Sequence, residues 1–150
     1  MIKVLSILLA TVTCISAAQQ NELVVNHIGL QLLPGEFQVC RLGNTASIPH
    51  WAMTGTPISI TRSSEALSII APANLVPPGI NCAKGWRMFE VGFNPPEAFG
   101  VVESFARPVA EQHISIHWIS SSPTDYLMVE QQNVEAAIHV LSAAGHPIHR

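Results

Sequence analysis

The chain has 150 residues, of which 48% are hydrophobic and 11% are charged, and its net charge is −3. This length suggests one compact domain or two very small ones, and this composition excludes an intrinsically disordered protein. The 7 lysines and arginines form no basic stripe, so nucleic acid is not expected as a partner.

Residues 1–18 have the layout of a secretory signal peptide. Lys3 precedes an apolar run from Val4 to Ile15, and Ser16-Ala17-Ala18 forms a small-residue cleavage pattern. The apolar run is too short to predict a transmembrane helix, so no membrane association is expected once the leader is removed. The alternatives are a buried N-terminal strand or an extension unrelated to the fold.

The first half of the remaining chain is rich in strand patterns. Residues 27–42 are expected to form two strands around a Pro34-Gly35 turn. Residues 57–70 alternate apolar and polar side chains around a polar tip, which predicts a hairpin. A loop with one helical turn is expected before this hairpin, at residues 43–56, and a connection rich in proline and glycine follows it, at residues 71–85.

The second half alternates strands and helices. The expected order is a strand (86–93), a helix (94–113), a hairpin (114–129), a helix (131–145) and a short last strand (146–149). This β-α-β-β-α-β order is typical of a split βαβ unit, a four-stranded antiparallel sheet with two helices on one face. The predicted fold class is therefore α+β and ferredoxin-like.

The first of these helices shows a clear apolar face. Val101, Phe105 and Val109 recur at intervals of four residues. Pro95 and Pro96 suit a helix start, where a missing backbone N–H has no cost. Pro108 is expected to kink the helix or to end its regular part.

A weak internal repeat relates the two hairpins. Ile58-Ser59-Ile60 precedes a serine-rich tip with Glu65, and Ile114-Ser115-Ile116 precedes a serine-rich tip with Asp125. Two related half-units would bury each other's sheet edges or faces. The predicted division is a leader at 1–18, an N-terminal half at 28–84 and a C-terminal domain at 85–149.

Several motifs in this order resemble those of small tandem ACT-domain proteins. They include "LQLLPGEFQVCRL", "ISITRSSEALSI" and the segment from Gly100 to Val129, and together they run from about Leu30 to His146. These proteins are related to the CASTOR-type arginine sensors and to the regulatory ACT modules of aspartate kinases. The resemblance implies tandem βαββαβ units, often paired into a homodimer, that bind a small ligand, usually an amino acid, and are not enzymes.

The predicted ligand site joins the hairpin tip to the start of the first helix. Asp125, the only aspartate in the chain, is expected to meet the ammonium group of an amino acid. Backbone N–H groups at a helix start suit its carboxylate. The hypothesis is that eight residues bind the ligand: Glu97, Ala98, Phe99, Gly100, Ser120, Ser121, Thr124 and Asp125. The alternative is that Asp125 only hydrogen-bonds the backbone of its own turn.

The sequence predicts no metal, cofactor or catalytic site. His113 and His117 are four residues apart in a strand-like segment, where they share no helix face, and no cysteine or acidic residue completes a zinc pattern. There is no nucleophile elbow and no glycine-rich phosphate loop.

Three functional hypotheses remain open from the sequence. The first is a regulatory module that binds an amino acid. The second is a structural or dimerisation module with a degenerate pocket, and the third is an exported protein that reuses the scaffold. The resemblance implies a cytoplasmic protein, whereas the leader indicates secretion.

The leader also bears on the two cysteines that follow it, Cys40 and Cys82. In an exported protein they could form one disulfide, but their spacing does not show it. The segment around Cys40 is strand-like, so a small buried apolar side chain is the other interpretation.

Overall fold

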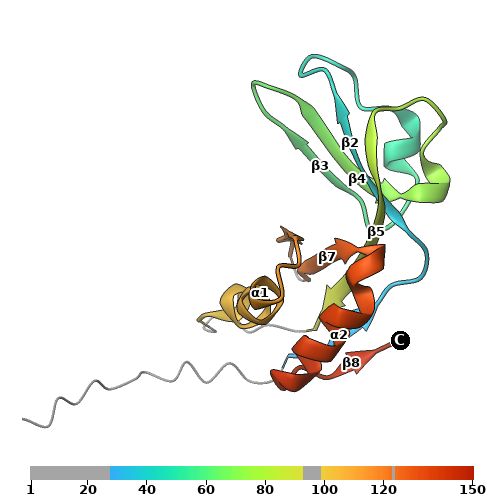
Figure 1. Cartoon of the computed structure of the whole chain (residues 1–150). Coiled ribbons are helices and arrows are strands. Elements are labelled where there is room, and N and C mark those ends of the chain that lie inside the picture. The colour runs from blue at the N-terminus through green and yellow to red at the C-terminus, as the bar shows by residue number, and fades with distance from the viewer. Residues whose placement is uncertain (1–27, 93–98, 123) are drawn as a thin grey trace, which may run out of the picture.

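The computed structural model describes residues 28–92, 99–122 and 124–150, and Figure 1 shows the arrangement of their strands and helices. The strands are β1 (Leu30–Leu32), β2 (Phe37–Leu42), β3 (Ser59–Arg62), β4 (Leu67–Pro72), β5 (Cys82–Val91), β6 (Ile116–Ile119), β7 (Tyr126–Glu130) and β8 (Ile148–His149). The α-helices are α1 (Val101–Glu111) and α2 (Val134–Ala143). Short 3-10 helices occur at His50–Met53, Ala73–Leu75 and Gln131–Asn133.

The long strand β5 holds the sheet together. One edge of β5 pairs with β2 near its start and with β1 near its end, and the other edge pairs with β7. Beyond β2 the sheet continues through β4 to β3, and beyond β7 it continues to β6. Figure 1 shows the result: β2, β3 and β4 form one part of the molecule, the helices lie beside the other, and β5 runs between them.

The predicted β-α-β-β-α-β order is confirmed, with one addition to its sheet. Strand β8 pairs in parallel with β1, not with β5, because β1 already occupies that edge of β5 through the Leu30–Val91 pairing. The sheet is otherwise antiparallel. The division at residues 84 and 85 stays a prediction: β5 runs across that point, and β1 pairs with strands of the C-terminal half.

The main core lies between the sheet and the two helices. The predicted apolar face of α1 is confirmed, since Val101, Phe105 and Val109 are all buried. They share one cluster with side chains of α2 and of the central strands, so both helices cover the same face of the sheet. Other buried members of this cluster include Leu30, Phe89, Val91, Leu127, Val129, Ala137 and Leu141.

The start and the interior of α1 differ from the sequence expectation. The helix begins at Val101, directly after Gly100, which adopts a left-handed conformation with φ of 74°. Pro95 and Pro96 lie outside the described residues. Pro108 does not end the helix, which continues to Glu111. A proline has no N–H to donate to the carbonyl oxygen four residues earlier, which here belongs to Ser104.

A ring nitrogen of His146 lies within hydrogen-bonding distance of the carbonyl oxygen that Pro108 leaves without its helical partner. Its side chain is buried, with Nε2 3.3 Å from the Ser104 oxygen and Nδ1 3.2 Å from the Ile28 oxygen. The imidazole also lies 4.0 Å from the Phe105 ring, measured between ring centroids. The loop after α2 is thereby tied to α1 and to the chain just before β1.

The other face of the sheet carries a smaller apolar cluster at the junction of the two parts. Its buried members come from both: Phe37 and Ile70 from β2 and β4, and Trp86, Met88 and Met128 from β5 and β7. Ile119 and Tyr126 pack against it. This cluster places the β3–β4 hairpin against the β6–β7 hairpin without help from either helix.

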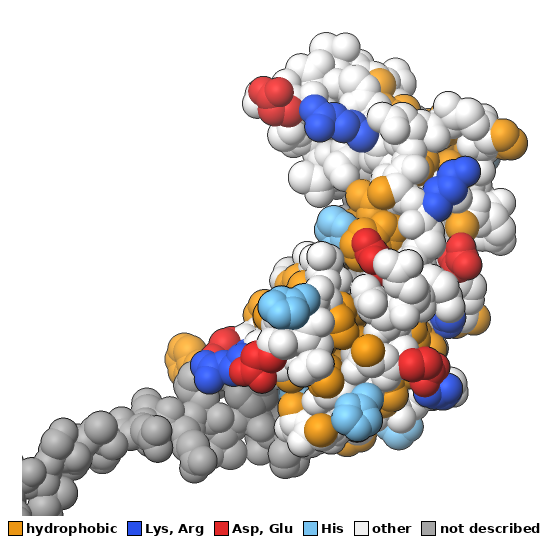
Figure 2. All heavy atoms as spheres, in the orientation of Figure 1, with side chains coloured by type: hydrophobic (Ala, Val, Ile, Leu, Met, Phe, Trp, Pro, Cys, Tyr) orange, Lys and Arg blue, Asp and Glu red, His pale blue; other side chains and the backbone are white. Residues whose placement is uncertain are grey.

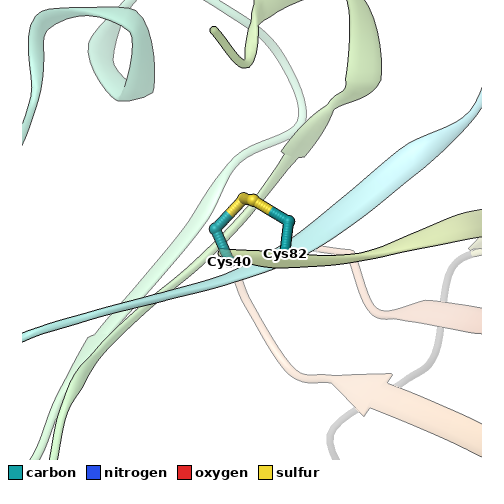
Figure 3. The surroundings of a disulfide bond; sticks show 2 residues. All are labelled: Cys40 and Cys82. Atoms are coloured by element: carbon teal, nitrogen blue, oxygen red, sulfur yellow. A yellow bond between two sulfur atoms is a disulfide. The ribbon is translucent and has the colours of Figure 1, made fainter. Parts of the chain in front are cut away.

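The part built from β2, β3 and β4 contains no α-helix among its described residues. On the side of its sheet away from the junction, its buried side chains form a cluster of Cys40, Ala52, Leu67, Ile69 and Ala71. Cys40 and Cys82 lie opposite each other on β2 and β5 and form a disulfide (Figure 3). The disulfide interpretation of these cysteines is therefore the one that the structure supports.

Candidate functional site

The predicted site at the tip of the β6–β7 hairpin forms a connected set of hydrogen bonds. The backbone N–H of Ser121 donates to Asp125 Oδ1 at 3.2 Å, and the Ser121 hydroxyl donates to the Thr124 carbonyl oxygen. Trp118 Nε1–H donates to Ser120 Oγ at 3.1 Å. Ser120, Ser121, Thr124 and Asp125 are thus brought together by the hairpin.

Asp125 has a structural role at this tip. Its carboxylate accepts a hydrogen bond from its own turn, which is the alternative that the sequence left open. Its backbone oxygen accepts the N–H of Val91 at 2.9 Å, which joins the start of β7 to the end of β5. The side chain is half-buried, and among the described residues only Oδ1 of its carboxylate accepts a hydrogen bond, which leaves Oδ2 for a further partner.

The helix end of the predicted site is described only in part. Glu97 and Ala98 lie outside the described residues. Phe99 is 75% exposed and Gly100 caps α1. Among the residues that the structure describes, no hydrogen bond joins Phe99 or Gly100 to the four residues of the tip. The stacking of Phe105 on Trp118, with ring centroids 5.6 Å apart, holds α1 against β6.

A cleft of about 360 Å³ lies beside this tip, between β3 and the β6–β7 hairpin. Figure 2 shows a hollow at the waist of the molecule, between its two parts, with hydrophobic side chains gathered there. Ser120 and Ser121 line the cleft, whereas Asp125 does not. The full lining is Thr56, Pro57, Ile58, Ser59, Ile60, Met88, Ile119, Ser120, Ser121 and Tyr126.

Most of these lining residues were missed by the sequence analysis. The repeat drew attention to Ile58-Ser59-Ile60, but only as the first strand of a hairpin. Nothing in the local pattern indicates that this strand faces residues more than fifty positions later. The two walls meet because β5 pairs with β7 along one edge and with β2 along the other, and β2 is joined through β4 to β3.

Burial shifts the pKa values of two side chains near the cleft, those of His117 and Tyr126. It lowers the pKa of His117, whose ring meets the edge of Trp86 at 4.5 Å between centroids. Burial raises the pKa of the Tyr126 hydroxyl, and the negative charge of Glu90 adds to that increase. Both shifts favour the neutral form of the side chain.

The described residues offer neither a cluster of metal ligands nor a membrane-spanning helix. No group of three or more His, Cys, Asp or Glu side chains gathers there in a way that could hold a metal ion. None of the helices in residues 28–92, 99–122 and 124–150 has the length and apolar character of a membrane span.

Comparison with family models identifies the second half of the chain. An ACT-domain model matches residues 81–143, and a model of an N-terminal domain matches residues 35–79. The solved structure of protein Atu0741 from Agrobacterium tumefaciens is 32% identical, with a TM-score of 0.75, over 83% of this chain and 97% of that chain. The chain belongs to the ACT-domain family.

Two further structures extend this ACT fold assignment. A protein of unknown function from Vibrio cholerae, described as a possible transport protein, is 20% identical with a TM-score of 0.67, over 80% of this chain and 91% of that one. The ligand-free regulatory subunit of aspartate kinase from Thermus thermophilus is 12% identical with a TM-score of 0.56, over 77% and 97%. The comparison with curated proteins gives no match.

These comparisons confirm the predicted family and fold class. The chain is an α+β protein with ferredoxin-like ACT units, and it has the architecture of the regulatory modules of aspartate kinases. At such low identity the aspartate kinase structures support the fold alone.

Proposed function

We propose that this ACT protein is a non-catalytic regulatory module that binds a small molecule, in the first instance an amino acid, and acts as a homodimer. The observation that carries the proposal is the ACT-domain match over residues 81–143, in a fold shared with a regulatory subunit of aspartate kinase. The similarity is to the regulatory part of aspartate kinase, which supports a regulatory role rather than a catalytic one.

The proposed ligand contacts are those predicted from the sequence. The open carboxylate oxygen of Asp125 would accept a hydrogen bond from the ligand's ammonium group, and the free N–H groups at the start of α1 would bind its carboxylate. Phe99 and Gly100 lie at that helix start. Glu97, Ala98, Ser120, Ser121 and Thr124 complete the proposed set.

A thermal-shift screen with the amino acids tests this proposal. A ligand at about 100 times its Kd stabilises the folded chain by about 2.7 kcal/mol, so the matching amino acid should raise Tm by several degrees. Asp125→Asn should remove the shift, because the neutral amide lacks the negative charge that attracts an ammonium group. Glu65→Gln is the matched control, since Glu65 lies at the tip of the related hairpin and is exposed.

Two results would contradict the proposal. One is a screen in which no amino acid changes Tm. The other is a shift of unchanged size in Asp125→Asn. Either result, together with a stable dimer in light scattering, would favour a structural or dimerisation module whose pocket is degenerate. The Asp125–Ser121 hydrogen bond is the observation that favours this second candidate.

A third candidate, an exported protein, is favoured by the Cys40–Cys82 disulfide. Disulfides persist in oxidising compartments and are rare in the cytosol. The disulfide agrees with the signal-like residues 1–18, and together they support secretion over a cytoplasmic location. N-terminal sequencing of the protein from its native cell should give Gln19 as the first residue. A first residue at position 1 or 2 would overturn export through this leader.

A further inference from the structure

The cleft between β3 and the β6–β7 hairpin shares Ser120 and Ser121 with the proposed amino-acid contacts, but Asp125 and the start of α1 are not among its lining residues. Its walls come from the two parts of the molecule, and the apolar cluster around Trp86 and Met88 fixes their separation. At about 360 Å³ its volume is near the lower end of the range of about 300–1,000 Å³ that is usual for small-molecule sites.

Hydroxyl groups with free hydrogen-bonding capacity surround the cleft. The side-chain oxygens of Thr56, Ser59 and Tyr126 make no hydrogen bond to any part of the chain that the structure describes. Ser120 Oγ accepts from Trp118, so its own proton remains available. Only the Ser121 hydroxyl is already committed, to the Thr124 carbonyl. A ligand could therefore be oriented by several donors and acceptors.

The remaining walls are apolar and uncharged. Ile58, Ile119 and Met88 line the cleft, and none of its ten lining residues is an acid, a lysine, an arginine or a histidine. A charged ligand group placed there would give up part of its hydration without gaining an opposite charge, which is costly. Tyr126 also stays neutral, because burial and Glu90 both raise its pKa.

An open strand edge adds main-chain groups to the same site. Among the described strands, β3 pairs only with β4, so its second edge carries unpaired backbone N–H and C=O groups. Ser59 and Ile60 of this strand line the cleft. Ser59 lies opposite Ile70, which is part of the junction cluster, so the side chain of Ser59 faces the cleft.

We infer that this cleft binds a small uncharged molecule that presents an apolar group together with amide or hydroxyl groups. The inference rests on the proposed function only in that the chain takes a small-molecule ligand. It assigns that ligand, or the uncharged portion of it, to the cleft between the two parts. It also predicts that charged groups of similar size are rejected.

Chemical-shift mapping on the isotope-labelled full chain tests the inference with two matched probes. N-acetyl-leucinamide is uncharged and carries a branched apolar group beside two amides. N-acetyl-lysinamide has the same amides with an ammonium group in place of the branched end. The leucine probe should shift the backbone signals of residues 56–60 and 119–121, and the lysine probe at equal concentration should not.

Two variants locate the binding within the cleft. Ser59→Phe should fill the cleft and weaken binding of the leucine probe at least about tenfold, a change of about 1.4 kcal/mol. Thr61→Phe is the control, because it places the same ring on the same face of β3 but outside the lining. Tyr126→Phe removes one hydroxyl without filling space, so it should weaken binding less than Ser59→Phe does.

The outcomes separate this inference from the proposed function. The inference is overturned if the leucine probe shifts no signals in residues 56–60, if both probes bind equally, or if Ser59→Phe and Thr61→Phe behave alike. An amino-acid stabilisation that Asp125→Asn removes but Ser59→Phe leaves intact would retain the proposed function and reject the cleft. Loss of that stabilisation in Ser59→Phe, with Thr61→Phe unaffected, supports both.

Discussion

The two parts of the molecule are stabilised in different ways. The part with β5, β7 and the two helices buries a continuous cluster that includes Phe89, Phe105 and Leu127. The part with β2, β3 and β4 has 3-10 turns in place of α-helices, a smaller set of buried side chains and the Cys40–Cys82 disulfide.

The comparison shows what helices contribute to an ACT unit. An amphipathic helix covers a whole sheet face with apolar side chains, whereas a 3-10 turn covers little of it. A small region with little buried surface needs another source of stability, and a disulfide is a common one. The cleft lies beside the junction cluster, where the helix-covered part of the molecule meets the part that contains the disulfide.

The largest expected effect is in the helix-covered part. Phe105→Ala removes a fully buried ring that contacts Trp118 and His146, so it should lower the free energy of unfolding by about 3–5 kcal/mol. Chemical denaturation measures the loss. Val102→Ala is the control, because Val102 is 45% exposed on the same helix and should cost far less. Similar losses in both variants would contradict the core described above.

The next largest effect is the loss of stability on removing the disulfide, and it should differ between the two parts of the molecule. Replacing both Cys40 and Cys82 by alanine opens a loop with a sequence separation of 42, which should lower stability by about 2–4 kcal/mol. Hydrogen exchange should accelerate more in β2–β4 than in β7, because the disulfide joins β2 to β5. The double variant should no longer respond to a reductant. Uniform acceleration across both parts would show that they do not differ in this way.

The smallest effect concerns pH and the junction between the parts. Because burial lowers the pKa of His117 below its ordinary value of 6.5, the unfolded chain binds this proton more readily than the folded chain. The free energy of unfolding is therefore not reduced by this group above pH 6.5, and it decreases as the pH falls below that value. Urea midpoints measured between pH 7.5 and 5 should therefore decline on the acid side, following roughly the titration range of histidine.

Two histidine variants assign that decline. His117→Gln should flatten it, whereas His139→Gln, at an exposed position of α2, should leave it unchanged. A decline of equal size in wild type and His117→Gln would show that other groups cause the acid sensitivity.

The sequence predicted one part of the candidate site, the hairpin tip, better than it predicted the helix start or the cleft. Ser120, Ser121, Thr124 and Asp125 share one hairpin, so local sequence sufficed to place them together. That the hairpin tip and the start of α1 form one site stays a prediction, and the stacking of Phe105 on Trp118 shows only that α1 packs on β6. The cleft could not be predicted, because Ser59 and Ile119 are far apart in sequence and no short-range pattern relates them.

Sequence alone determined the elements with strong periodicity: both hairpins, the helix face of Val101, Phe105 and Val109, and the order of strands and helices along the chain after Trp86. Periodicity reports which face of an element is apolar, and that information is local. Only the tertiary structure decided that β1 pairs with β5, that β8 lies parallel to β1 and that Cys40 meets Cys82. These choices depend on which distant edges and faces meet, and that is settled by the packing of the whole chain.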